Sequence, residues 1–199
     1  MIRSFTRRLA LLALTACLAV PAFAQADPQD DALVAKAVAY LDGLTSVRGA
    51  FQQTDNKGVT ATGTFYLARP GRARFEYDPP SGLVITSDGK TVVMTDSRLK
   101  TIQRIPLSST PLAVFLADHI RLDRGAKVSR VDRTAQGFSI TARDSHGLSQ
   151  GEITLYFNES PMRLAGWTIV DAQSRTTRVA LGALSPLANP SPDLFSQSQ

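Results

Sequence analysis

The side chains that could perform acid–base or metal chemistry are few in this sequence. The only histidines, His119 and His146, each lack a second ligand at the spacing that metal sites use. The carboxylates that could form acid pairs are Asp144 with Glu152 and Asp171 with Glu159. Nothing in the sequence fixes the separation within either pair. Because a nucleophile elbow, a P-loop and a dinucleotide fingerprint are also absent, we expect no enzyme, no metal and no cofactor.

One arginine stands in phase with the apolar residues of a predicted strand. In GTFYLARP, residues 63–70, Phe65 and Leu67 alternate on the same side as Arg69. A guanidinium directed toward an apolar face must find acceptors, because it has five donors and keeps its charge. A second interpretation stays open, in which Pro70 ends the strand at once and Arg69 is a solvated turn residue.

The N-terminus has the layout of a secretory signal peptide. An arginine-containing start precedes an apolar run at residues 9–20 and a small-residue pattern that ends at Ala24. The run is too short for a membrane-spanning helix. We therefore predict a signal peptide at residues 1–24, cleaved near Ala24, and a single domain at residues 25–199 that is soluble in the periplasm.

Cys17 is the only cysteine, and it lies inside the predicted signal peptide. Cleavage after Ala24 would leave no thiol for a disulfide or for thiolate chemistry. Leu14 to Cys17 also resembles a lipobox, so acylation and membrane anchoring at Cys17 remain an alternative. The signal peptide carries three positive charges, so the net charge falls from +5 to about +2 on cleavage. No basic stretch interleaved with aromatics indicates a nucleic-acid partner.

Two helices are predicted in the mature chain. Asp27 and Pro28 are typical of a helix start, and the helix ends near Gly43. Its apolar residues repeat at spacings of three and four: Leu33, Val34, Ala37, Val38, Leu41 and Leu44. A second, short helix is predicted within residues 109–120, after Thr110. Both helices have an apolar face that must cover another element.

The remaining chain is predicted to form about ten or eleven short antiparallel strands separated by turn sequences. So many twisted strands should curl into a barrel or partial barrel. One side of these strands, together with the second helix, carries a coherent apolar set: Val47, Phe51, Phe65, Leu67, Phe75, Tyr77, Leu112, Phe115, Leu116, Phe138, Ile140, Leu155, Phe157 and Trp167. The set is either an ordinary barrel core or the lining of a cavity that the helices cover without filling.

Four segments of the chain, in order, resemble the LolA family of periplasmic outer-membrane lipoprotein carrier proteins. They are Phe51-Gln52-Gln53 after the first helix, GTFYLARPGRARFEYDPP at residues 63–80, SDGKTVVMTDSRLKTIQRIPLSSTPLAVFL at residues 87–116, and GWTIVDAQSRTTRVAL at residues 166–181 with the terminal DLF. Together they span most of the mature chain. The short tail after Phe195 leaves little room for the C-terminal extension of some family members.

The resemblance implies a mainly β (α+β) fold, an incomplete, strongly curved antiparallel β-barrel covered by a helical lid. It implies a carrier that holds lipoprotein acyl chains in a hydrophobic cavity and moves lipoproteins from the inner to the outer membrane. The implied partners are acylated lipoproteins, an inner-membrane ABC-type release complex and an outer-membrane lipoprotein receptor. It also makes Arg69 a latch that binds backbone carbonyls of the lid.

Two alternatives to this carrier remain open. One is an outer-membrane receptor of the same fold anchored at Cys17, and the other is a carrier of a different lipid. We expect a monomer in each case. The basic residues Arg72 and Arg74, on the predicted outer face, are candidates for a docking surface.

Overall fold

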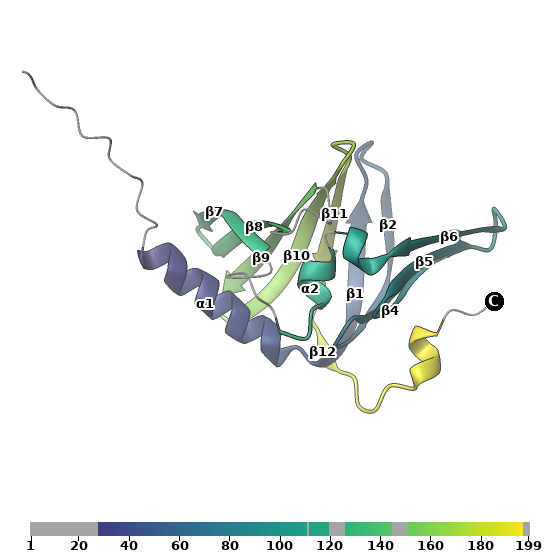
Figure 1. The fold of residues 1–199 in the computed structure, drawn as a ribbon, viewed down its shortest axis with the longest axis horizontal. Helices are drawn as coiled ribbons and strands as arrows, with labels where there is room; N and C mark the ends of the chain where they lie inside the picture. The colour runs from purple at the N-terminus through teal and green to yellow at the C-terminus, as the bar shows by residue number, and fades with distance from the viewer. Residues whose placement is uncertain (1–27, 111, 120–125, 145–150, 197–199) are drawn as a thin grey trace, which may run out of the picture.

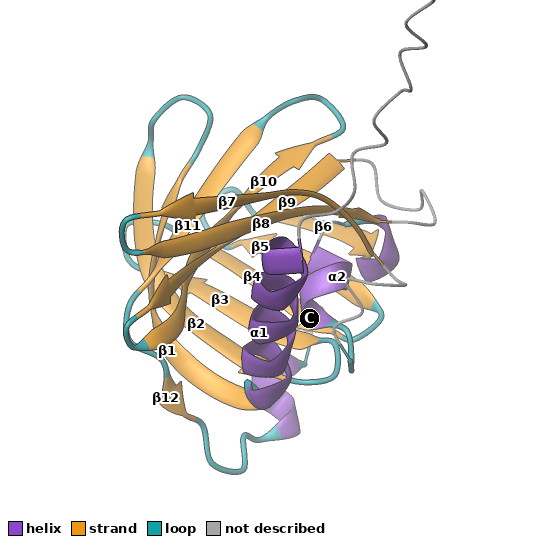
Figure 2. Ribbon diagram, turned by 90° about the vertical axis from the view of Figure 1, so that its left-hand side faces the viewer, coloured by secondary structure: helices purple, strands orange, loops and turns teal. Residues whose placement is uncertain are grey.

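The body of the protein is one antiparallel sheet of twelve strands in the computed structural model (Figures 1 and 2). The structure describes residues 28–110, 112–119, 126–144 and 151–196. The predicted signal peptide, Cys17 and His146 lie outside the described residues. The strands are β1 (Ser46–Thr54), β2 (Thr60–Ala68), β3 (Arg72–Tyr77), β4 (Leu83–Asp88), β5 (Thr91–Asp96), β6 (Thr101–Pro106), β7 (Ala126–Thr134), β8 (Gly137–Asp144), β9 (Gly151–Glu159), β10 (Met162–Asp171), β11 (Thr176–Leu181) and β12 (Ser185–Pro186).

The strand order is β6-β5-β4-β3-β2-β1-β11-β10-β9-β8-β7, and β12 pairs with β1. No pairing joins β6 to β7 among the described residues, so the sheet curves without closing. The prediction of an incomplete, strongly curved antiparallel barrel is confirmed. The two-residue strand β12 adds to the ten or eleven strands expected, because so short a pairing leaves no alternation in the sequence.

Aspartates build the tight turns of this sheet. In the turn between β1 and β2, the Asp55 carboxylate accepts the backbone N–H groups of Lys57 and Val59, each at 2.8 Å. Asp88 and Asp171 accept N–H groups in the same way in the β4–β5 and β10–β11 turns. These side-chain bonds replace backbone partners that the turn geometry removes, and they fix the register of each hairpin.

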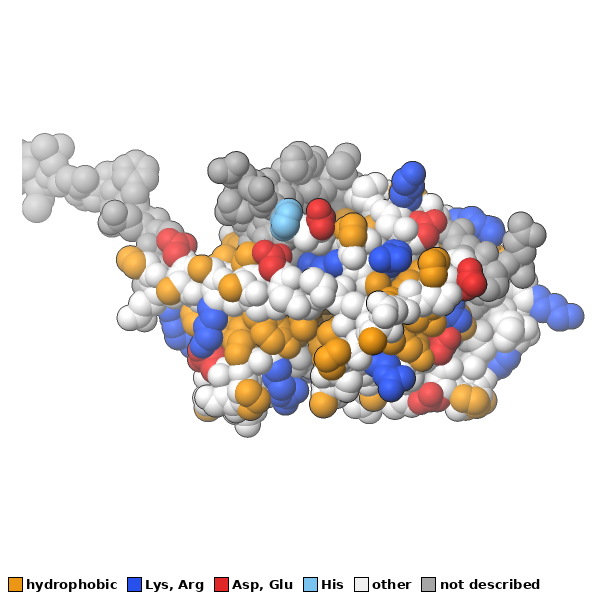
Figure 3. Space-filling view, turned by 90° about the horizontal axis from the view of Figure 1, so that it is seen from below, with side chains coloured by type: hydrophobic (Ala, Val, Ile, Leu, Met, Phe, Trp, Pro, Cys, Tyr) orange, Lys and Arg blue, Asp and Glu red, His pale blue; other side chains and the backbone are white. Residues whose placement is uncertain are grey.

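Two helices lie on the concave side of the sheet (Figures 1 and 2). Helix α1 (Pro28–Gly43) contacts β7 and β10, and ion pairs of Lys36 with Glu159 (2.6 Å) and Asp30 with Arg133 (2.8 Å) tie it to that half of the sheet. Helix α2 (Leu112–Leu116) follows the 3-10 turn η1 (Leu107–Ser109). Seen from below, hydrophobic side chains gather in the hollow beside α1 (Figure 3).

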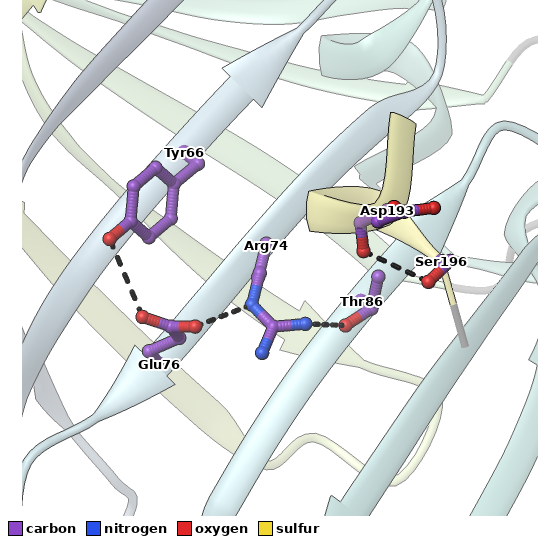
Figure 4. A network of polar contacts seen from close by, with 6 residues as sticks. All are labelled: Tyr66, Arg74, Glu76, Thr86, Asp193 and Ser196. Carbon is purple, nitrogen blue, oxygen red and sulfur yellow. Dashed lines mark hydrogen bonds and ion pairs between the residues drawn. The ribbon is translucent and has the colours of Figure 1, made fainter. Parts of the chain in front are cut away.

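The convex side carries the C-terminal 3-10 turn η2 (Pro192–Phe195), which contacts β3 and β4. Phe195 is buried there, with the Arg72 guanidinium 5.5 Å from the centre of its ring. Next to it, Arg74 bonds Glu76 (2.7 Å) and Thr86 (3.3 Å) (Figure 4). Both arginines that the sequence offers as a docking surface therefore have intramolecular partners.

Candidate functional site

The concave face is apolar because strand alternation directs one side of each strand inward. Thirteen of the fourteen residues predicted to line a cavity are buried, and the fourteenth, Leu112, packs against them, all in one hydrophobic cluster. Trp167 lies at its centre, with ring centroids 5.4 Å from Phe115, 5.8 Å from Phe65 and 6.1 Å from Phe75. The predicted set is thus brought together at one place, beneath α1 and α2.

Most of the described residues on this inner face are buried by their neighbours. One end stays open as a cavity of about 350 Å³, whose apolar wall includes Phe75, Leu112 and Trp167. Only four of the predicted lining residues, these three and Tyr77, border the open space. Among the described residues, most of the predicted set is thus buried in the cluster, and part of it borders a cavity at one end.

Segment η1–α2, residues 107–116, forms a lid, which packs Phe115 and Leu116 into the cluster. The lid is joined to the turn between β2 and β3 by two hydrogen bonds. The Gly71 N–H donates to the carbonyl oxygen of Leu116 at 2.8 Å, and Arg69 Nη1 donates to the carbonyl oxygen of Ala117 at 3.1 Å. Both acceptors are carbonyls at the end of α2, which lack partners within the helix.

Arg69 follows the last residue of β2 and is half-buried beneath this lid. Its guanidinium lies 5.3 Å from the centre of the Phe115 ring. Burial lowers the pKa of Arg69 to about 10, and the negative charge of Asp42 acts in the opposite direction. With a pKa of about 10, the side chain keeps its positive charge at neutral pH. Its Nε and Nη2 atoms are buried and have no hydrogen-bond partner among the described residues. Arg69 therefore binds the lid through Nη1, while the hydrogen-bonding capacity of its other two nitrogen atoms is unused among the described residues.

Three further features of the site were not expected from the sequence. Gly71 contributes a backbone bond, which no side-chain pattern reveals. Against the larger effect of burial, the negative charge of Asp42, at the end of α1, raises the pKa of Arg69. Gln53 lies on the apolar inner face and borders the open cavity. For Gln53 a signal did exist, since it shares parity with Val47 and Phe51 on the same strand.

The carboxylates of one candidate acid pair, Asp171 and Glu159, have partners elsewhere in the structure. The described residues contain no group of three His, Cys, Asp or Glu side chains close enough to hold a metal ion. Asp171 is bonded to Arg175 at 2.7 Å, and Glu159 to Lys36 at 2.6 Å. These two carboxylates therefore serve a turn and a helix contact. Within the described part of the chain, no helix is long and apolar enough to cross a membrane.

The fold and the site define a class, an open antiparallel β-barrel with an apolar inner face under a small helical lid. The chain matches the family described as outer membrane lipoprotein carrier protein LolA over residues 42–198. It is 34% identical over 203 residues to the outer-membrane lipoprotein carrier protein of Bordetella pertussis, covering 96% of this chain and 91% of that protein. The chain belongs to the LolA family.

A second carrier-protein relative agrees with this membership. The outer-membrane lipoprotein carrier protein of Chromobacterium violaceum is 34% identical over 128 residues, which span 61% of this chain and 58% of that relative. A LolA superfamily protein of Nitrosomonas europaea has a solved structure with a TM-score of 0.46 and 9% identity, covering 82% of this chain and 97% of that one.

Proposed function

We propose that this protein is a periplasmic carrier that binds the acyl chains of lipoproteins and moves them from the inner to the outer membrane. The observation that carries the proposal is the apolar inner face beneath a lid held at its end by Arg69 and Gly71. Membership of the LolA family supports it. The proposed role is a binding and transfer function without catalysis.

The chemistry of the cargo explains why such a protein is needed. Each methylene transferred from water to an apolar environment contributes about 0.8 kcal/mol, and an acylated protein N-terminus carries dozens of them. Free diffusion through an aqueous compartment is therefore strongly disfavoured. An apolar cavity that travels with the cargo removes this cost.

The size of the open cavity implies that the lid moves during loading. A cavity of about 150 Å³ holds one benzene molecule, so 350 Å³ accommodates on the order of a dozen carbons. Two or three acyl chains need several times that space. We expect the cargo to displace α2 and its side chains Phe115 and Leu116 from the cluster. The position of the lid in this structure is then the closed one.

Arg69 is suited to control this movement. Its bond to Ala117 stabilises the closed state, whereas the desolvation of its guanidinium, two of whose nitrogen atoms have no partner among the described residues, opposes closure. The balance keeps the closed and open states close in free energy, so cargo can shift the population between them. A carrier with such a balance can both load and release.

The proposed pathway places the protein between two membrane partners. After cleavage near Ala24, the soluble monomer would receive acylated lipoproteins from an inner-membrane ABC-type complex and deliver them to an outer-membrane receptor. Binding of a synthetic triacylated lipopeptide tests the carrier role. We expect tight binding, and no binding of the same peptide without acyl chains. Equal binding of both peptides would contradict the proposal.

The lipobox-like segment before Cys17 supports one alternative, a membrane-anchored receptor of the same fold. Mass spectrometry of the mature N-terminus separates the two. A chain that begins at Gln25 supports the carrier, and an acylated Cys17 supports the receptor. A carrier of a different lipid would share the same cavity and would differ only in what it binds.

A further inference from the structure

Gln53 is a polar side chain in an otherwise apolar row of the inner face. The sheet register places it opposite Val179, which lies opposite Trp167, and the row continues through Leu155 and Ile140. All four of these neighbours are buried and apolar. An amide in this position costs free energy of desolvation that a leucine would not. The cavity wall therefore includes a polar group that packing alone does not require.

Tyr77 is the partner of Gln53. Its hydroxyl donates a hydrogen bond of 2.7 Å to Gln53 Oε1, and its side chain is 8% exposed. This bond uses the tyrosine proton and the carbonyl oxygen of the amide. Among the described residues nothing accepts a hydrogen bond from Gln53 Nε2, and nothing donates to the Tyr77 oxygen. The pair thus offers two N–H donors and one acceptor, held at a fixed position.

Both side chains border the cavity of about 350 Å³. The cavity lies at the end of the sheet where β1 turns into β2 and β10 turns into β11, and Figure 1 shows both turns at the end away from α1. Its edge includes the ion pair of Asp171 and Arg175, at 2.7 Å. Apolar residues therefore line the interior, and the polar groups are confined to a few positions near its mouth.

We propose that Gln53 and Tyr77 bind the carbonyl group at the head of an acyl chain whose hydrocarbon occupies this cavity. The Gln53 amide donates to the carbonyl oxygen of an ester or amide linkage. Where the linkage is an amide, the Tyr77 oxygen also accepts its N–H. The pair fixes the depth at which the chain stops, and it selects acylated molecules over plain hydrocarbon. The inference rests on the proposed carrier function and adds a position and a chemistry to it.

The test compares two synthetic lipopeptides of equal chain length, one with ester-linked chains and one with ether-linked chains that lack the carbonyl. One hydrogen bond to a carbonyl predicts that the wild-type protein binds the ester about five- to tenfold more tightly. We expect Gln53→Leu to abolish this preference while its affinity for the ether stays unchanged. Tyr77→Phe, which leaves the amide unanchored, reduces the preference in part.

Gln52→Leu is the matched control, because the same change falls on the exposed convex side of the same strand. It should keep the wild-type ratio. A third probe carries a single amide-linked chain. Tyr77→Phe should weaken the binding of this probe more than the binding of the ester-linked probe, because only the amide has an N–H that the Tyr77 oxygen can accept.

Three results would overturn the inference. In one, the wild-type protein binds ester and ether equally. In another, Gln53→Leu keeps the wild-type ratio. In the third, Gln53→Leu loses affinity for both probes, which would make Gln53 a structural residue. If the wild-type protein binds neither lipopeptide, the carrier function itself fails and the inference fails with it.

Discussion

Arg69 Nη1 donates a hydrogen bond of 3.1 Å to the carbonyl oxygen of Ala117, 48 residues further along the chain. Two residues after Arg69, the Gly71 N–H donates to Leu116. The turn that joins β2 to β3 thus holds the end of α2 through a side chain and through the backbone. Opening the lid requires both bonds to break, and the loss of one changes the balance without removing the other.

Replacement of Arg69 by leucine should change cargo release more than cargo loading. Arg69→Leu removes the hydrogen bond to Ala117, which only the closed state makes, and it adds apolar surface against which acyl chains can pack when the lid is open. The closed state is then less stable relative to the loaded, open state, so the free energy that favours release is smaller. We expect loading with lipoprotein to be retained and transfer to receptor-containing vesicles to fall at least about tenfold, a change of about 1.4 kcal/mol, comparable with one charge-assisted hydrogen bond.

The control for this variant is Arg178→Leu, on the exposed side of β11. It makes the same chemical change away from the lid and should transfer cargo at the wild-type rate. If Arg69→Leu also transfers at the wild-type rate, Arg69 has no role in gating.

Gly71 cannot be replaced without loss of stability. Its φ is +72°, and a Cβ at this position would overlap the backbone of Gly89. Gly58 has a similar φ of +80° but no atom near its Cβ position. Both Gly71→Ala and Gly58→Ala incur the cost of a left-handed residue, about 1 kcal/mol. We expect Gly71→Ala to lose about 1–3 kcal/mol more in urea unfolding, because of the overlap. Equal losses would contradict the close contact with Gly89.

Sequence alternation predicted much of the fold and part of the site. The strands around Phe65 and Phe75, the helix that ends at Gly43 and the apolar set around Trp167 all follow from periodicity, because one face of each element must be buried. The inward parity of Arg69 came from the same alternation. The latch role of Arg69 came from family resemblance and remains a proposal.

Other features depend on contacts that a sequence does not encode locally. How far side chains fill the inner face is set by packing in three dimensions, so the sequence could not separate a filled core from a cavity. Phe195 is a single aromatic residue in a polar tail, and no period marks its burial on the convex side beside Arg72. The hydrogen bond from Gly71 involves only backbone atoms, so no residue type in the sequence indicates it.

Phe115 should control the lid, whereas residues deeper in the sheet should control global stability. Both Phe115 and Leu155 are 1% exposed. Leu155→Ala should cost about 2–5 kcal/mol of unfolding free energy, as is usual for a core residue. Phe115→Ala should instead open the lid locally, because α2 is short and held by few bonds. We expect reduced hydrogen-exchange protection at residues 112–117 and a red shift in the emission of Trp167, the only tryptophan. Equal loss of protection throughout the chain would contradict a separate lid.

The stability of the protein at high pH should depend on Tyr77. Burial raises the pKa of Tyr77 to about 12. Between pH 10 and about 12 the unfolded chain therefore releases a proton that the folded protein retains, and stability falls as the pH rises. A shift of this size corresponds to about 2–3 kcal/mol.

Denaturant unfolding of the wild type and of Tyr77→Phe between pH 9 and about 12 measures this contribution. The difference between the two proteins isolates the tyrosine, since the effect of the lowered Arg69 pKa is common to both. The difference in stability should shift in favour of Tyr77→Phe across this range. A pH-independent difference would contradict the burial of a neutral hydroxyl.

The most direct test of the carrier proposal is the identity of the molecule bound to the protein after gentle purification from the periplasm. Native mass spectrometry measures the mass of the complex and of what is released from it. We predict a lipoprotein that retains its acylated N-terminus, bound to one copy of the protein. A preparation in which the protein carries no acylated molecule, even when the inner-membrane donor complex is active, would contradict the proposed function.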